Sequence, residues 1–280
     1  MCIRDRHSSV ALWPKKRGNR LTILSAMNLN RAGRLSWNHP QKGCEIDLKI
    51  MLVTNQWIGL TSAGGISRPS RDLALALVRE KHEVKVLVAW ADAEGEPIAD
   101  GITVEVLSGD TPHAVQPESL SKEYFTAQRI LDWDPEIVIA QDYFGLAAVY
   151  SSFGSRAKLV TWIHGGTLYE LEGQNKYFSG NQQAVRAELE RLQLEASDYI
   201  VSPSAFMLDH YKNRYHFQLP QAHVIPYHFP EPETIEQASL VEGTNFIFVG
   251  RLSTRKGVSE FLEAVRLAQS VFSQISVQIA

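Results

Sequence analysis

The chain has 280 residues, of which 44% are hydrophobic and 21% charged, and its formal net charge is −3. This length allows one large domain or two ordinary ones, and the composition is typical of globular rather than disordered proteins. The charge balance gives no indication of a nucleic-acid partner. No apolar run approaches the roughly 20 residues that a membrane-spanning helix needs.

The first segment, residues 1–47, differs from the rest in charge. It holds nine Lys or Arg residues against three acidic ones, a difference of +6, and it shows no sustained hydrophobic period. Both cysteines, Cys2 and Cys44, lie here without metal-ligand spacing, which fits a reducing compartment. We expect 1–47 to be a non-native or disordered basic extension, with a transit peptide as the alternative.

From residue 48 onward, strand and helix signals alternate. Continuous apolar strands that alternate with amphipathic helices predict a parallel sheet covered on both faces. Residues 48–225 are therefore predicted to form a doubly wound α/β domain. The predicted strands are 49–54, 83–89, 102–107, 136–140, 158–163, 198–202 and 223–226, and the predicted helices are 67–80, 119–133, 143–153, 182–197 and 204–215.

A Pro-rich, acidic stretch, 226–244, interrupts this alternation and is typical of an interdomain linker. The pattern then restarts in 245–280 with a strand, a helix and another strand. About 36 residues are far fewer than the roughly 100–150 of a usual domain. We therefore expect 245–280 to be the truncated start of a second domain.

The first candidate for binding is Gly64-Gly65 in "TSAGGISR", directly after the first strand of the domain. Glycines let the backbone approach a ligand closely, and the following helix start can bind an anion. A tight strand-to-helix turn is the alternative. The G-x-G-x-x-G fingerprint of dinucleotide-binding proteins is absent from this stretch.

The second candidate is His164 in "TWIHGG", at the end of a later strand. Ligands of open α/β sheets gather at the carboxyl ends of the strands, and Gly165 and Gly166 would clear space there. A structural, hydrogen-bonding histidine is the alternative.

The third candidate is the pair of cations Arg251 and Lys256 in "FVGRLSTRKG". Cations at the start of a helix oppose its dipole, so their placement makes sense if they surround a bound anion. A solvated charge pair is the alternative. The acidic pair Asp132 and Asp134 precedes a strand and is expected to form a turn, and no zinc, P-loop or hydrolase motif is present.

Taken together, these stretches resemble the family four retaining glycosyltransferases of GT-B architecture, over about 49–280. In that family two Rossmann-like domains face each other, and the C-terminal one binds a nucleotide-sugar donor. The matching stretches are "GGISR", "HEVKVLV", "DPEIVIAQDYFG", "VTWIHGG", "ASDYIVSPSAFMLDHY" and "FVGRLSTRKGVSEFLEAV". The last of these is the most specific.

The resemblance implies roles for the candidate residues. Arg251 and Lys256 match the pair that holds the donor diphosphate, so neither a metal nor another cofactor is expected. Gly64 and Gly65 match the glycine loop that lines the cleft. His164 matches the active-site histidine, whose hydrogen bond to a sugar hydroxyl is favoured over proton abstraction.

The resemblance also implies the partners: a nucleoside-diphosphate sugar and a glycosyl acceptor that the sequence does not identify. The implied location is cytoplasmic, with peripheral attachment to the inner membrane face left open. Two departures stand out. "IPYHF" replaces the Ile-Pro-Asn-Gly usual in the family, and the two glutamates expected later in the C-terminal domain are missing.

The truncated second domain and its missing glutamates predict that the 280-residue chain is an inactive fragment. Two other functions stay open on the sequence alone. One is a Rossmann-type nucleotide-dependent oxidoreductase or epimerase, and the other is a non-catalytic partner subunit that binds sugar nucleotides.

Overall fold

The computed structural model divides the chain into two units, Met1–Glu45 and Ile46–Ala280. In the first unit the described residues form a short antiparallel pair, β1 (Asn28–Leu29) and β2 (Leu35–Ser36), which the sequence did not predict. The structure describes residues 28–29, 35–36, 47–60, 65–89, 101–107, 121–154, 156–172, 180–219, 221–227, 244–250, 252, 256–271 and 275–279.

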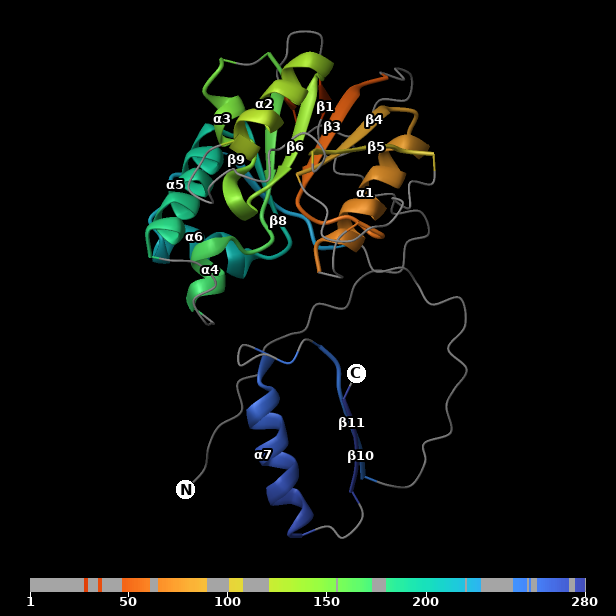
Figure 1. Ribbon diagram of the computed structural model, residues 1–280, viewed down its shortest axis with the longest axis vertical. Coiled ribbons are helices and arrows are strands. Elements are labelled where there is room, and N and C mark those ends of the chain that lie inside the picture. The colour runs from red at the N-terminus through yellow and green to blue at the C-terminus, as the bar shows by residue number, and fades with distance from the viewer. Residues whose placement is uncertain are drawn as a thin grey trace. The chain divides into compact units, whose positions relative to one another are not determined.

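Seven parallel strands form the main sheet of the second unit, in the order β5-β4-β3-β6-β7-β8-β9 (Figure 1). β3 pairs with β4 on one side and with β6 on the other, so the strand order reverses at this point. The predicted doubly wound α/β class is confirmed. The strands are β3 (Lys49–Thr54), β4 (Glu83–Val88), β5 (Thr103–Val106), β6 (Ile137–Gln141), β7 (Lys158–Trp162), β8 (Tyr199–Ser202) and β9 (Gln221–Val224).

Helices connect the strands and cover both faces of this sheet. Because crossovers between parallel strands are right-handed, α1 lies on one face and the helices after β5 lie on the other. The helices are α1 (Ser67–Arg79), α2 (Ser121–Trp133), α3 (Ala148–Ser151), α4 (Thr167–Glu172), α5 (Gly180–Ala196) and α6 (Ala205–Arg214). Among the described residues, no helix is both long and apolar enough to cross a bilayer.

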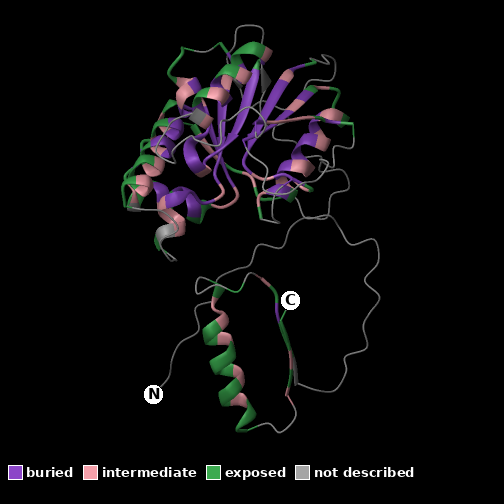
Figure 2. Ribbon diagram, in the orientation of Figure 1, coloured by how far each residue is buried: buried purple, intermediate pink, exposed green. Residues whose placement is uncertain are grey.

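Burial on both faces explains the continuous apolar strands (Figure 2). Met51 and Val53 of β3 pack in one cluster with Ile130 of α2. Ile50 and Leu52 alternate with them along the strand, so they point to the opposite face, and both are fully buried. A strand that is covered on both sides has no polar face to interrupt its apolar run.

The predicted helix over 143–153 is wrong in its first half. The chain instead forms a 3-10 turn, η2 (Tyr143–Gly145), followed by the four-residue α3. Phe144 has φ +70° and Gly145 has φ +61°, and two successive left-handed residues cannot continue an α-helix. The sequence also did not predict α4.

The described residues after 243 form a β-α-β unit, as predicted for 245–280. β10 (Thr244–Phe248) pairs in parallel with β11 (Ile275–Ile279), and α7 (Val258–Gln269) connects them. Phe248 packs on Phe261 with ring centroids 5.3 Å apart. No described residue of α7 is buried. The predicted linker, 226–244, lies mostly outside the described residues, so the domain boundaries stay a prediction.

Candidate active site

The loop after β7, residues 164–167, has its backbone N–H groups bound by buried side chains. Asp142 follows β6, the neighbour of β7, so both lie at the carboxyl edge of the sheet. Its carboxylate is buried and accepts hydrogen bonds from His164 N at 2.9 Å and Gly165 N at 3.2 Å. Asp142 therefore fixes the backbone at His164 and so the direction in which its side chain leaves the loop.

Two further side chains bind the rest of this loop. Tyr211 of α6 donates its hydroxyl proton to Asp142 Oδ2 at 2.7 Å and accepts from Gly166 N at 2.6 Å. Glu190 of α5 accepts from Thr167 N at 2.8 Å and from Thr167 Oγ1 at 2.6 Å. Four successive amides are thus satisfied within the protein, so this loop does not offer them to an anion.

Glu190 also binds the unpredicted turn η2. Its carboxylate accepts from Phe144 N at 2.8 Å, which brings η2 to the start of α4. The carboxylate lies at the N-terminal end of α4, where the helix dipole favours negative charge. One buried acid therefore joins two irregular segments of the same sheet edge.

The two buried carboxyl groups have raised pKa values. Burial is the main cause for both, because it disfavours the charged form. For Glu190, repulsion from Asp142 adds to burial and raises the pKa to about 8, although the hydrogen bonds from Thr167 and Phe144 oppose the shift. Near neutral pH Glu190 therefore favours its protonated, neutral form.

The free energy of unfolding should depend on pH because the pKa of Glu190 is raised. The pKa of Glu190 is about 8 in the folded chain against an ordinary 4.5, so the native state binds the proton more tightly. The stabilisation is complete below about pH 4.5 and is lost as the pH rises through 8. Glu190→Gln stays neutral, so wild type should lose about 1.4 kcal/mol per pH unit relative to it in this window. Denaturant unfolding of both chains at pH 5 and pH 8 measures the difference, and a constant difference would contradict the assignment.

His164 is held as a neutral ring. Burial lowers its pKa to about 3, so the imidazolium is absent at neutral pH. Its Nδ1 lies 2.6 Å from the hydroxyl of Tyr227, which follows β9. Within the part of the chain that the structure describes, the buried His164 Nε2 has no hydrogen-bond partner. Its hydrogen-bonding capacity is therefore unused within the described residues.

The glycines after His164 serve internal packing, which differs from the expectation that they clear space for a ligand. A Cβ on Gly166 would lie 2.4 Å from Glu190 Oε2 and 3.1 Å from Tyr211 Oη. Gly165 has φ +103°, a conformation that side chains rarely adopt. Both glycines are required by the buried hydrogen bonds of the loop.

Gln141, the last residue of β6, binds the start of the loop that follows β3 at this same edge of the sheet. Its side chain accepts from Asn55 N at 3.3 Å and donates to Ser70 Oγ of α1 at 2.8 Å. Gly65 lies just before α1, with open space where a Cβ would be. The structure therefore brings Gly65 and His164 to one edge, whereas Gly64 lies outside the described residues.

The predicted cation pair is described only in part. Lys256 is exposed and precedes α7, whose N-cap Gly257 has φ +74°. Arg251 lies outside the described residues. Lys256 belongs to the β10-α7-β11 unit, whereas His164 belongs to the seven-stranded sheet.

Sequence reasoning missed the three side chains that hold the loop, Asp142, Glu190 and Tyr211, and it noted Tyr227 only within a departure from the family pattern. Asp142 carried a positional signal, because it follows a predicted strand at the carboxyl edge. Glu190 and Tyr211 carried none, since a polar residue on a helix is ordinarily assigned to the solvent face. Among the residues described, no group of three or more His, Cys, Asp or Glu side chains could hold a metal ion.

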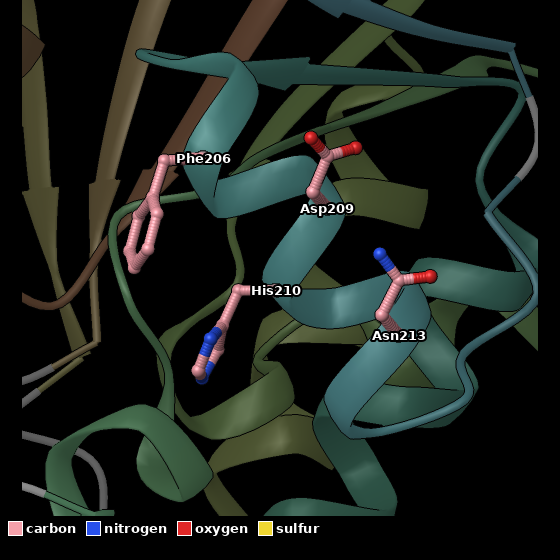
Figure 3. A pocket seen from close by; sticks show the side chains of 4 residues that line it. All are labelled: Phe206, Asp209, His210 and Asn213. Carbon is pink, nitrogen blue, oxygen red and sulfur yellow. The ribbon is translucent and has the colours of Figure 1, made fainter. Parts of the chain in front are cut away.

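A shallow hollow of about 350 Å³ lies elsewhere, along α6. Figure 3 shows the four side chains that line it, with Phe206 and His210 along one edge of this face of the helix and Asp209 and Asn213 along the other. Phe206 is 61% exposed, and His210 Nε2 lies 2.8 Å from a Glu172 carboxylate oxygen. None of the predicted site residues lines this hollow, so it is a surface feature of α6 and separate from the His164 site.

The chain resembles several solved glycosyltransferase structures. The catalytic domain of starch synthase IV from Arabidopsis thaliana, bound to ADP and acarbose, matches with TM-score 0.52 and 12% identity, over 84% of this chain and 69% of that one. A glycosyltransferase from Rickettsia africae matches with TM-score 0.52 and 11% identity, over 84% of this chain and 69% of that one. A UDP-forming α,α-trehalose-phosphate synthase from Burkholderia xenovorans, in complex with glucose-6-phosphate, matches with TM-score 0.52 and 15% identity. The match covers 83% of this chain and 65% of that one.

At these identities the likeness shows the fold, and the chain spans 65% to 69% of the three solved chains. No curated protein sequence matches the chain. The model of Glycosyltransferase Family 4 matches residues 63–227, which is more than half of the 280 residues. This match contains Gly65, the 164–167 loop and the three buried side chains that hold this loop, Asp142, Glu190 and Tyr211. The chain therefore belongs to glycosyltransferase family 4, and its seven-stranded sheet is the Rossmann-like sheet of a GT-B glycosyltransferase.

Proposed function

We propose that this protein transfers a sugar from a nucleoside-diphosphate donor to a glycosyl acceptor, with retention of configuration and without a metal ion. The observation that carries the proposal is the neutral His164, held at the carboxyl edge of a family 4 sheet with a free, buried Nε2. Ligands of doubly wound sheets bind at this edge, beside the point where the strand order reverses.

The electrostatics of His164 favour hydrogen bonding over proton abstraction. A general base works best when its pKa lies near the operating pH, and a pKa of about 3 is far below neutrality. A neutral imidazole can still donate or accept a hydrogen bond at the oxygen of a sugar hydroxyl. In this proposal His164 therefore orients the transferred sugar.

Charge on the departing diphosphate would be stabilised by Arg251 and Lys256. The exposed Lys256 ahead of α7 supports this role, because a helix start that already favours anions gains from a nearby cation. A fixed pair of cations can do the work that a divalent ion does in other transferases. The glycines Gly64 and Gly65 would line the cleft near the donor phosphates and the acceptor.

The acceptor is a polysaccharide, a lipid-linked sugar or a small molecule, and the proposed location is the cytoplasm, including the inner membrane face. The chain spans about two thirds of the solved relatives, so we propose no turnover for the 280 residues alone. The exposure of α7 supports the expected inactivity. Because no described residue of α7 is buried, the helix is weakly stabilised and holds Lys256 poorly in position.

Donor binding and transfer test the proposal. Isothermal titration of the chain, and of a longer form with the rest of its C-terminal domain, should show tight binding of UDP-, GDP- or ADP-sugars only for the longer form. Product NMR should show the donor's anomeric configuration, and EDTA should leave the rate unchanged. Inversion, EDTA sensitivity or binding of NAD(H) instead would overturn the proposal.

A further inference from the structure

Tyr227 stands where the resemblance to family 4 predicts asparagine after the Ile-Pro pair. In the structure its hydroxyl oxygen lies 2.6 Å from His164 Nδ1. The two rings stack with centroids 5.6 Å apart and planes 13° apart. Trp162, the last residue of β7, packs on His164 with centroids 4.6 Å apart and on Tyr227 at 5.8 Å. These three aromatic rings form a cluster at the carboxyl edge of the sheet.

The direction of the hydrogen bond between Tyr227 and His164 follows from their chemistry. Both groups are neutral, because burial raises the pKa of Tyr227 and lowers that of His164. A phenol O–H is a better donor than a neutral imidazole N–H, and an imidazole nitrogen is a better acceptor than a phenol oxygen. Within the described chain Tyr227 Oη has no hydrogen-bond partner besides His164. The favoured bond therefore runs from Tyr227 Oη–H to Nδ1.

A proton on Tyr227 directed at Nδ1 leaves the imidazole's own proton on Nε2. That nitrogen is buried and unpartnered among the described residues, and so is the indole Nε1 of Trp162 on the adjacent ring. Trp162 is 5% exposed and its Nε1 can only donate. Buried N–H groups without acceptors are rare in native proteins, so two in adjacent rings indicate a ligand that brings oxygen acceptors.

We propose that Tyr227 is a positioning residue that fixes the Nε2–H tautomer of His164, so that His164 and Trp162 present N–H donors to the hydroxyl oxygens of a sugar. The ligand class rests on the proposed function, whereas the tautomer rests on the geometry alone. A neutral oxygen with lone pairs, such as a sugar hydroxyl, fits two neutral donors in an apolar, aromatic surrounding. The aromatic faces also suit the apolar C–H face of a sugar ring.

The tautomer can be measured directly on the 280-residue chain. Long-range ¹H–¹⁵N NMR of the ¹⁵N-labelled protein distinguishes a protonated from an unprotonated ring nitrogen, and His164→Gln assigns the signals. Wild type should show His164 as the Nε2–H tautomer, with Nδ1 unprotonated. Tyr227→Phe keeps the stacked ring and removes only the hydroxyl, so it should shift His164 to a mixture of the two tautomers.

Tyr215→Phe is the matched control. Tyr215 Oη lies 3.2 Å from Nε2 of a different histidine, His210, so its loss should leave the His164 signals unchanged. A wild-type His164 protonated on Nδ1, or an unchanged tautomer in Tyr227→Phe, would overturn the inference. The spectra need no sugar nucleotide, so failure of the proposed function would leave this result standing, and the wild-type spectrum decides even if a variant misfolds.

Discussion

Replacing Lys256 with alanine is expected to lower kcat by about 10²–10³-fold, the scale seen when one preorganised charge stabiliser is lost. The effect should fall on kcat, because the charge on the diphosphate grows as the glycosidic bond breaks. Arg251→Ala should have an effect of the same size. Lys256→Arg should also reduce turnover, because a planar guanidinium presents its donors differently from an ammonium group. Under the proposed function, steady-state kinetics of a form with a whole C-terminal domain would measure all three variants.

Arg266→Ala provides the control for these substitutions. Arg266 lies on the same helix, α7, and is exposed, but it is paired with Glu263 at 2.7 Å. Removing this cation changes the net charge as Lys256→Ala does, and it should leave kcat within about twofold, since exposed pairs contribute little. Near-normal rates in both Arg251→Ala and Lys256→Ala would remove the diphosphate assignment.

Gly145→Ala is expected to destabilise the fold by about 4 kcal/mol. A Cβ at this position would lie 2.4 Å from the carbonyl carbon of Leu189 and 2.7 Å from Glu190 N. These are backbone atoms of α5, which cannot rotate away, so the overpacking alone should cost about 3 kcal/mol. The φ of +61° adds about 1 kcal/mol for any residue with a side chain. Urea denaturation of both chains would give the difference in the free energy of unfolding.

Gly154→Ala separates the two causes. Gly154 has a nearly equal φ of +64°, but nothing lies within 4 Å of an added Cβ. This variant should lose only the conformational part, about 1 kcal/mol. Equal losses in Gly145→Ala and Gly154→Ala would show that the approach of η2 to α5 is not close in solution.

The parallel sheet could be predicted because its strands are buried on both faces. Residues such as Ile50 and Met51 belong to a continuous apolar run, which is typical of a strand covered on both faces. The turn η2 could not be predicted from the apolar pattern of 143–153. Its left-handed Phe144 depends on a hydrogen bond to Glu190, which lies 46 positions later in the chain. Interactions between distant residues leave no local period in the sequence.

The position of His164 could be predicted, whereas the way in which it is held could not. Its place after a strand puts it at the ligand-binding edge of any doubly wound sheet. The support comes from Asp142, Glu190 and Tyr211, which are polar side chains inside the core. Composition and periodicity assign such residues to the surface. Gly165 and Gly166 mark this loop in the sequence, but they make room for buried side chains of the protein and not for a ligand.

Holding residues 164–167 by side chains from three separate elements has a consequence for how a ligand is received. Most of the backbone conformational entropy of this segment is lost when the protein folds, so little of it remains to be lost on binding. A sugar that reaches His164 meets a backbone already fixed at four successive amides. Any rearrangement that accompanies binding must then occur elsewhere in the chain, and this segment acts as the fixed reference against which it moves.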